Sequence, residues 1–284
     1  MPILVDLNQV MISNIMVQIG NHQNAQIDEN MIRHMVLNSL RSNRMKFKED
    51  FGDLVICADD KNYWRKGFFP YYKANRKKNR EQSELDWNGI FNALNNIRSE
   101  LKETFPYKVI QIDRAEADDI IGTIVHREGT ILNNGVPLLI LSGDKDYVQL
   151  HKYGNVSQFD PVKKRWIRHD NPEKFLIEHI LKGDSGDGIP NIMSADNCFM
   201  LGIRQKPMTE KRMEEYASIN NLSEDLVKNY NRNKKLIDLA EVPTDIKDKI
   251  IGEYDAENKK NRSNLLNYFM EKNLRNLTAH LNEF

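Results

Sequence analysis

Four short runs of apolar residues punctuate the first half of the chain, at residues 3–5, 54–58, 109–112 and 138–141. Runs of this length predict strands that are buried on both faces of a parallel sheet. Segments with helical periodicity lie between them, such as the segment at residues 87–101. Strands that alternate with helices predict a doubly wound α/β fold with a mostly parallel sheet.

The second half of the chain is predicted to be helical. Residues 172–182 begin with a proline and are followed by Gly183, which are start and stop signals of a helix. From residue 206 onward the pattern is again helical and rich in Lys, Asn and Glu. We therefore expect an α/β domain at residues 1–170 and a helical domain at residues 171–284.

Acidic residues follow each of the four predicted strands. The carboxyl ends of parallel strands meet at one edge of an open α/β sheet, and ligand sites form there. We therefore expect seven carboxylates to converge at this edge, namely Asp6, Asp59, Glu116, Asp118, Asp119, Asp144 and Asp146. Any one such acid is most often a helix cap or a turn former. Seven of them together would repel one another at neutral pH unless bound cations neutralise them.

The types of ligand in this group indicate which cation it would bind. Carboxylates without His or Cys favour Mg²⁺ or Mn²⁺ over zinc. Two such ions can activate a water molecule and stabilise the leaving oxygen of a phosphodiester. The glycine-rich stretch at residues 183–190 adds Asp184 and Asp187. The sequence therefore predicts a site for two Mg²⁺ ions, which Mn²⁺ can replace, with nine candidate carboxylates.

Positive charge is concentrated in one stretch, although 41 basic and 41 acidic residues give a formal net charge of zero. Residues 61–80 carry eight Lys or Arg side chains and no acid. Lys73, Arg76, Lys77 and Arg80 have the spacing of a basic stripe on a helix. Such a run is often only a solvated charged face. Because aromatic residues accompany it, we favour a channel for single-stranded nucleic acid, in which cations follow the backbone and rings stack on bases.

The order of these motifs resembles that of the flap endonuclease/5′-exonuclease family. The resemblance rests on Asp6 and Asp59 and on the stretches 116–119, 142–146 and 183–190. Two further stretches, at residues 63–76 and 281–284, resemble the 5′ nucleases of T-even-like phages more narrowly. The resemblance covers nearly the whole chain. It implies a PIN/5′-nuclease-like fold and a phosphodiester hydrolase with 5′-3′ exonuclease, flap endonuclease and ribonuclease H activity, which removes primers during DNA replication.

The resemblance also implies roles for residues outside the acidic edge. A basic arch at about residues 61–85 would pass the 5′ end, with Lys73 and Arg76 as catalytic residues near the scissile phosphate. The loop at residues 183–191 would join the helices of a helix-hairpin-like element that grips duplex DNA, where backbone oxygens can hold a K⁺ ion. The residues expected to contact nucleic acid are Arg65, Lys66, Lys77, Lys78, Arg80, Gly183, Gly186, Gly188 and Ile189.

This chain departs from the family pattern in the same loop. Relatives commonly have Asn in place of Gly188 and a glycine-rich run near residues 191–196, where this chain has no glycine. The departure concerns the K⁺ site and the duplex contact, and leaves the carboxylates untouched. The expected substrates are DNA and RNA·DNA duplexes with 5′ ends or flaps. A single-stranded-DNA-binding protein or a sliding clamp is the expected replication partner, and the chain is expected to be a monomer.

Two other functions fit the acidic edge. A PIN-class ribonuclease shares it, but such domains generally lack the Gly/Asp loop at residues 183–190. A structure-specific DNA-binding module without catalysis is the second alternative. No apolar run approaches the roughly 20 residues of a membrane span, no signal peptide is recognised, and there are only two cysteines. We therefore expect a cytoplasmic protein, in the host bacterium if a phage encodes it.

Overall fold

The computed structural model describes residues 2–21, 28–83, 85–129 and 135–284, without the side chains of residues 18–21 and 77–79. Its centre is a six-stranded sheet with strand order β3-β2-β1-β4-β5-β6. The strands are β1 (Pro2–Asp6), β2 (Asp53–Cys57), β3 (Lys108–Ile110), β4 (Leu138–Leu141), β5 (Val156–Asp160) and β6 (Arg165–Ile167). Neighbouring strands from β3 to β5 are parallel, and β6 is antiparallel to β5. The prediction of a doubly wound, mostly parallel sheet is confirmed.

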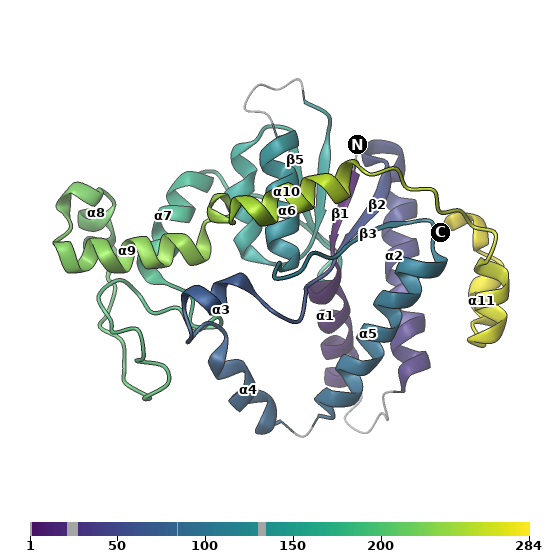
Figure 1. Ribbon diagram of the computed structural model, residues 1–284, viewed down its shortest axis with the longest axis horizontal. Coiled ribbons are helices and arrows are strands. Elements are labelled where there is room, and N and C mark those ends of the chain that lie inside the picture. The colour runs from purple at the N-terminus through teal and green to yellow at the C-terminus, as the bar shows by residue number, and fades with distance from the viewer. Residues whose placement is uncertain (1, 22–27, 84, 130–134) are drawn as a thin grey trace.

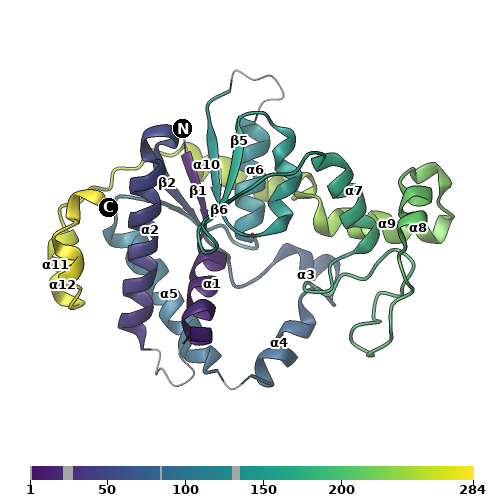
Figure 2. The same ribbon diagram turned by 180° about the vertical axis from the view of Figure 1, so that it is seen from behind.

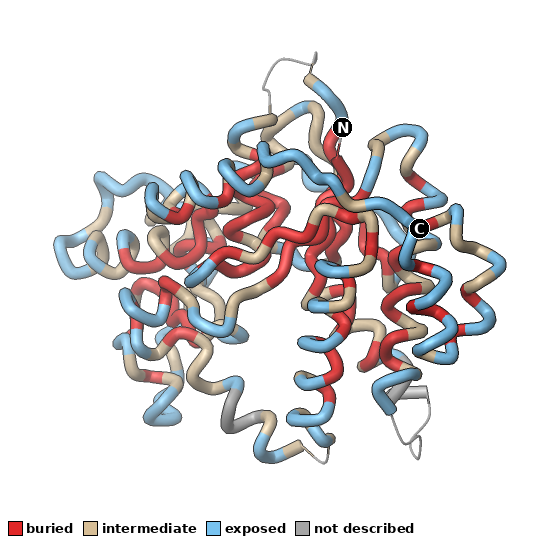
Figure 3. The backbone as a smooth tube through the Cα atoms, turned by 45° about the vertical axis from the view of Figure 1, so that its right-hand side comes forward, coloured by how far each residue is buried: buried red, intermediate tan, exposed pale blue. Residues whose placement is uncertain are grey.

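Helices cover both faces of the sheet (Figures 1 and 2). One face packs against α1 (Leu7–Asn21), α2 (Glu29–Phe51) and α5 (Trp87–Thr104). The other packs against α6 (Ala117–Glu128) and α10 (Thr244–Asp255). Because successive side chains of a strand point to opposite faces, Ile3 and Val5 belong to the first core and Leu4 to the second. Figure 3 shows that the buried segments gather in the centre of the molecule, around the sheet.

The last helices pack on the two faces of the sheet. Ile246 and Ile250 of α10 lie in the same core as α6. Phe269 of α11 (Leu265–Glu271) and Phe284 lie in the core of the opposite face. The chain after α9 (Glu224–Ile237) therefore completes the hydrophobic cores of the sheet, and the division into two domains near residue 170 stays a prediction.

Two insertions extend from these layers. Between β2 and α5 the chain forms α3 (Trp64–Phe68) and α4 (Ala74–Glu81), which extend away from the sheet (Figure 1). Beyond β6, α7 (Pro172–Lys182) and α9 lie at the opposite end of the molecule from α11. The expected hairpin of two helices around residues 183–191 is wrong in one respect, because the chain stays irregular up to α8 (Glu210–Tyr216).

Within the described ranges, no helix has the length and apolar character needed to cross a membrane.

The packing of α11 generates a prediction of stability. Phe269 is fully buried and contacts the rings of Phe105 and Phe284, whereas its neighbour Met270 is 66% exposed. We expect Phe269→Ala to lower the free energy of unfolding by about 3–5 kcal/mol, because it leaves a cavity in the core. Met270→Ala should change it by less than about 0.5 kcal/mol. Urea unfolding measures both, and equal losses for the two variants would contradict this placement of α11.

Candidate active site

The predicted acids converge at the carboxyl ends of the central strands. β1 lies between β2 and β4, where the strand order changes direction, which is where sites form in this class of sheet. Asp6 ends β1, and the other acids follow β2, β3 and β4 or lie in the loop after α7. We call the nine carboxylates the acidic rim, namely Asp6, Asp59, Glu116, Asp118, Asp119, Asp144, Asp146, Asp184 and Asp187.

The N-terminus of α6 positions three of these acids. Glu116 is the N-cap residue, and the Asp119 carboxylate accepts a hydrogen bond from the Glu116 backbone N–H at 2.9 Å. This capping box fixes the first turn of the helix. Carboxylate oxygens of Glu116, Asp118 and Asp119 lie within 4.8 Å of one another. Asp118 is the one member of this turn that is only partly buried and has no ion-pair partner among the described residues.

Arg65 lies beneath this turn and not on the surface. Its residue is 1% exposed, and its guanidinium nitrogens lie 2.9 Å from Glu116 and 2.8 Å from Asp119. A third nitrogen donates to the backbone carbonyl of Leu236 in α9 at 2.8 Å. The prediction that Arg65 contacts nucleic acid is therefore wrong, because the side chain is buried and does not reach the surface. Its role is to hold two carboxylates of the rim.

Lys73 and Arg76 reach the rim from the start of the arch. The Lys73 ammonium pairs with Glu116 and lies 3.6 Å from Asp187, and Arg76 pairs with Asp187. Lys73 has a positive φ of 56° and lies before α4, so it does not belong to the basic helical stripe that was predicted. Burial lowers the pKa of Lys73, but Glu116 and Asp187 outweigh it and raise the pKa, so the amine stays charged.

Burial and counter-charge compete in setting the pKa values of the rim acids, and the pKa of Asp119 is raised by burial although Arg65 pairs with it. Burial raises the pKa of Glu116, but Lys73 and Arg65 outweigh it and hold that pKa below its usual value. Burial and the neighbouring Asp59 raise the pKa of Asp6 to about 7. Burial and the Glu116 carboxylate raise the pKa of Asp59 and, more strongly, that of Asp118. Asp6, Asp59 and Asp118 thus combine a raised pKa with the lack of a Lys or Arg ion-pair partner among the described residues.

A second cluster lies on the side of α7. Ligand atoms of Asp146, His179 and Asp184 all lie within 4.8 Å of one another. Burial and the Asp144 carboxylate raise the pKa of Asp146 to about 7. Burial raises the pKa of Asp184 too, but hydrogen bonds from His179 and Lys145 outweigh it and lower that pKa. Lys145 lies 2.8 Å from Asp184, so this acid already has a cationic partner.

The residues predicted to contact nucleic acid divide into surface and packing positions. Lys66, Arg80 and Gly186 lie at the surface or only partly buried. Ile189 is buried with Phe69 and Tyr72, so its predicted contact with nucleic acid is wrong. Gly183 and Gly188 have positive φ, and a Cβ atom at Gly188 would lie 2.8 Å from the backbone oxygen of Tyr71. These two glycines serve the close packing of the loop. The side chains of Lys77 and Lys78 lie outside the described residues.

Sequence reasoning missed three side chains at the rim. His179 lies between Asp146 and Asp184, and the Tyr72 hydroxyl lies 2.9 Å from Glu116 and 3.1 Å from Asp187. Lys145 stands within the motif at residues 142–146, but its charge was not assigned a role. No local pattern marks His179, since it reaches the rim only through the packing of α7 on residues 145–152.

The rim as a whole fits divalent metal ions. Nine carboxylates face four Lys or Arg partners, namely Arg65, Lys73, Arg76 and Lys145. The five acids without such a partner among the described residues are Asp6, Asp59, Asp118, Asp144 and Asp146. Of these five, Asp6 is buried, Asp59, Asp118 and Asp146 are partly buried, and Asp144 is exposed. Carboxylates crowded together without counter-charge are costly, and hard divalent cations with oxygen ligands remove that cost. Two divalent ions would supply four positive charges at this place.

Comparisons with known proteins agree with this geometry. Residues 4–178 match the family described as 5′-3′ exonuclease, N-terminal resolvase-like domain, and residues 170–284 match the family described as T4 RNase H, C terminal. Ribonuclease H of Enterobacteria phage T4 is 34% identical over 294 residues, which cover 99% of this chain and 95% of that protein. Flap endonuclease Xni of Shewanella denitrificans is 29% identical over 178 residues, or 59% of this chain and 66% of that protein.

Solved structures of bacteriophage T5 proteins have the same fold. The T5 flap endonuclease, solved as a pseudo-enzyme–product complex with DNA and metal ions, has a TM-score of 0.63 at 18% identity, covering 90% of this chain and 99% of that chain. The T5 5′-exonuclease with bound zinc has a TM-score of 0.61 at 19% identity, covering 89% and 98%. Since two family matches together span residues 4–284 and one relative is similar over nearly its full length, the chain belongs to the 5′-3′ exonuclease family, in the group of T4 ribonuclease H.

Proposed function

We propose that this protein removes RNA primers and 5′ flaps by metal-dependent hydrolysis of RNA·DNA and DNA duplexes. By family it is a structure-specific 5′ nuclease that hydrolyses phosphodiester bonds. The observation that carries the proposal is the set of five rim carboxylates without a Lys or Arg partner, at the switch point of the sheet. A phosphate could approach such a site only with cations between them, because carboxylates and phosphate repel.

The donor set supports two divalent ions, with Mg²⁺ as the cellular metal and Mn²⁺ as a substitute. Asp6, Asp59, Asp118 and Asp144 would hold the first ion. Asp146 and Asp184 would lie toward the second, directly or through water. Oxygen donors predominate, which suits a hard cation that keeps several waters. When bound, the ions would lower the pKa of a water nucleophile and stabilise the leaving oxygen.

The protein's own side chains have separate tasks in this proposal. Lys73 and Arg76 lie where the arch meets the rim, so their charges would stabilise the scissile phosphate as negative charge develops on it. Glu116 and Asp187 hold these two cations in place. Asp119 holds the first turn of α6 and Arg65, which makes it a positioning residue and not a ligand.

The loop at residues 183–191 does not require K⁺ in our proposal. The carbonyl oxygen of Pro190 accepts hydrogen bonds from Arg232 at 3.1 Å and from Asn233 at 2.8 Å. A buried guanidinium therefore occupies the place beside this carbonyl where a monovalent cation would be repelled. The exposed turn at Ser185 and Gly186 is the part of the loop that we propose contacts the duplex backbone.

The two alternatives are less well supported. A PIN-class ribonuclease does not account for the match at residues 170–284. A non-catalytic DNA-binding module does not account for nine acids that share one rim. Three expectations stay predictions. They are a sliding clamp or a single-stranded-DNA-binding protein as partner, the monomeric state, and the bacterial cytoplasm as compartment.

The first prediction concerns the unpaired acids. We expect Asp118→Asn and Asp144→Asn each to lower the rate of 5′-flap cleavage in saturating Mg²⁺ by more than about a hundredfold, since even metal-supporting residues outside the ligand set cost up to that much. Binding of the flap substrate should change little, because the lost charge also repels phosphate. Asp60→Asn is the matched control, since Asp60 accepts backbone hydrogen bonds from Asn62 and Arg114. Near-normal cleavage by either variant would overturn the metal assignment.

The second prediction concerns pH in the absence of divalent metal. The pKa of Asp6 and of Asp146 rises from 3.8 to about 7 on folding, so the folded state binds protons more tightly than the unfolded state. The free energy of unfolding should therefore fall as pH rises from about 4 to about 7, by up to roughly 4 kcal/mol for each group. In EDTA the Tm should be higher at pH 6 than at pH 8.

Metal and substitution should both remove this pH dependence. Mg²⁺ should raise the Tm more at pH 8 than at pH 6, because the ionised acids bind it. Asp6→Asn should raise the Tm at pH 8 in EDTA, whereas Asp248→Asn, at an exposed position of α10, should not. A Tm that rises with pH in EDTA would contradict the uncompensated charge of the rim.

The third prediction concerns the two cations at the base of the arch. Lys73→Ala and Arg76→Ala should lower kcat by about 10²–10³-fold while KM changes less, since their charges act on the developing negative charge. Lys249→Ala, at an exposed site on α10, should leave both constants unchanged. Single-turnover cleavage of a labelled flap separates the two effects. An effect confined to KM would show that Lys73 and Arg76 only bind substrate.

A further inference from the structure

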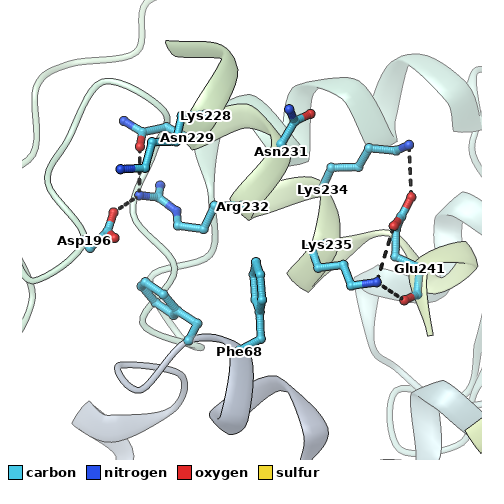
Figure 4. A pocket seen from close by; sticks show the side chains of 10 residues that line it. Phe68, Asp196, Lys228, Asn229, Asn231, Arg232, Lys234, Lys235 and Glu241 are labelled. Atoms are coloured by element: carbon cyan, nitrogen blue, oxygen red, sulfur yellow. Dashed lines mark hydrogen bonds and ion pairs between the residues drawn. The ribbon is translucent and has the colours of Figure 1, made fainter. Parts of the chain in front are cut away.

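A pocket of about 580 Å³ lies behind the acidic rim, between α3 and α9, and the mechanism proposed above does not use it. We call it the α3–α9 pocket. Among its lining residues are Phe68 of α3 and Lys228, Asn231, Arg232, Lys234 and Lys235 of α9 (Figure 4). Its volume is within the range of sites that hold a small organic ligand, such as a nucleotide.

The short helix α3 separates this pocket from the rim. Arg65 extends from α3 toward the rim and is buried, whereas Phe68 of the same helix lines the pocket and is 49% exposed. A helix of five residues is about 7.5 Å long. The two sides of this short helix therefore face two different sites, the rim and the pocket.

The pocket has an excess of positive charge. It contains the four cations Lys228, Arg232, Lys234 and Lys235, but only two acids. Arg232 pairs with Asp196, while Lys234 and Lys235 share Glu241, at 3.0 Å and 3.7 Å from its carboxylate. Lys228 is exposed and has no ion-pair partner in the part of the chain that the structure describes. An anionic ligand would find one free ammonium and a net positive environment.

An exposed aromatic ring completes the pocket. Figure 4 shows Phe68 on α3 facing the side chains of α9. Its neighbour Phe69 is buried among Tyr72, Leu236 and Ile237, so the backbone that carries Phe68 is held firmly. A ring in water next to cations is the arrangement that binds single-stranded nucleic acid, because the base stacks on the ring and the phosphate pairs with the ammonium.

We propose that the α3–α9 pocket binds a nucleotide of the displaced 5′ single strand, on the far side of α3 from the scissile phosphate. Phe68 stacks on the base, Lys228 pairs with a phosphate, and the exposed amide of Asn231 is within the same pocket for polar contact. The inference rests on the proposed function, since it assigns a second binding site for the same substrate. Net positive charge and one ring favour this occupant over a protein segment, for which the pocket offers only one exposed apolar side chain.

The test compares substrates that differ only in flap length. Nicked duplexes with a 5′ flap of one nucleotide or of about ten nucleotides are cleaved by the full chain and by two variants, Phe68→Leu and Lys228→Ala. We expect KM for the long flap to rise about 5- to 30-fold in each variant, as for the loss of one base stack or one phosphate contact. KM for the one-nucleotide flap should stay within about twofold, because that flap ends before the pocket.

Two control variants separate stacking from packing. Phe68→Tyr keeps the ring and should restore the wild-type KM for the long flap, whereas Phe68→Leu keeps only the apolar volume. Lys249→Ala removes an exposed lysine of α10 and should change neither substrate. Because Phe68 and Lys228 are exposed, their variants should keep the wild-type Tm.

A crosslinking arm gives a positive signal. 5-Iododeoxyuridine within the long flap should crosslink to the peptide that contains Phe68, and unlabelled long flap should compete. Equal KM changes on both flap lengths would overturn the pocket assignment. No change of KM on either flap would also overturn it, and would leave a protein partner as the occupant of the pocket. If the wild-type chain cleaves neither flap in Mg²⁺, the proposed function itself fails. If the wild-type chain cleaves both flaps and substitution of Phe68 changes neither KM, only the pocket assignment fails.

Discussion

A single buried guanidinium connects the parts of this molecule that must cooperate. Arg65 contacts Glu116 and Asp119 at the start of α6 and the Leu236 carbonyl at the end of α9. It thereby joins the arch, the helix that carries three rim acids and the C-terminal helices. Removing one partner of a buried ion pair leaves a charge without compensation and typically costs about 3–5 kcal/mol. The position of the arch relative to the rim is therefore fixed from inside the protein, before any substrate binds.

The distribution of counter-charge gives the rim two kinds of acid. Glu116, Asp184 and Asp187 are held by lysine or arginine side chains, and these cations lower the pKa values of Glu116 and Asp184. Asp6 and Asp118 have no such partner, and burial raises their pKa values. The paired acids form ion pairs that hold the site in shape. The unpaired acids leave negative charge that bound cations would neutralise. One rim can thus be rigid and still bind metal ions strongly.

The sequence alone was informative where a residue's role follows from local pattern. Four of the six strands and the whole of α7 could be predicted, because apolar runs and helix signals are local. β5 and β6 were missed, since polar residues interrupt β5 and β6 is a short edge strand. Arg65 was misassigned for the opposite reason. Its position within eight cations suggested a surface, and only the tertiary structure reveals that this one side chain turns inward.

The loop after α7 and the base of the arch are bonded to each other. The Lys73 backbone N–H donates to the Asp187 carbonyl at 2.7 Å, and the Asn75 amide donates to the Ser185 carbonyl at 3.0 Å. Gly188 lies against Tyr71 in a position that leaves no room for a side chain. The loop after α7 and the base of the arch, which we propose contact the duplex and the single strand, therefore cannot shift independently. In the proposed function, a junction between duplex and single strand would therefore meet one rigid surface, in which these two hydrogen bonds fix the spacing of its two halves.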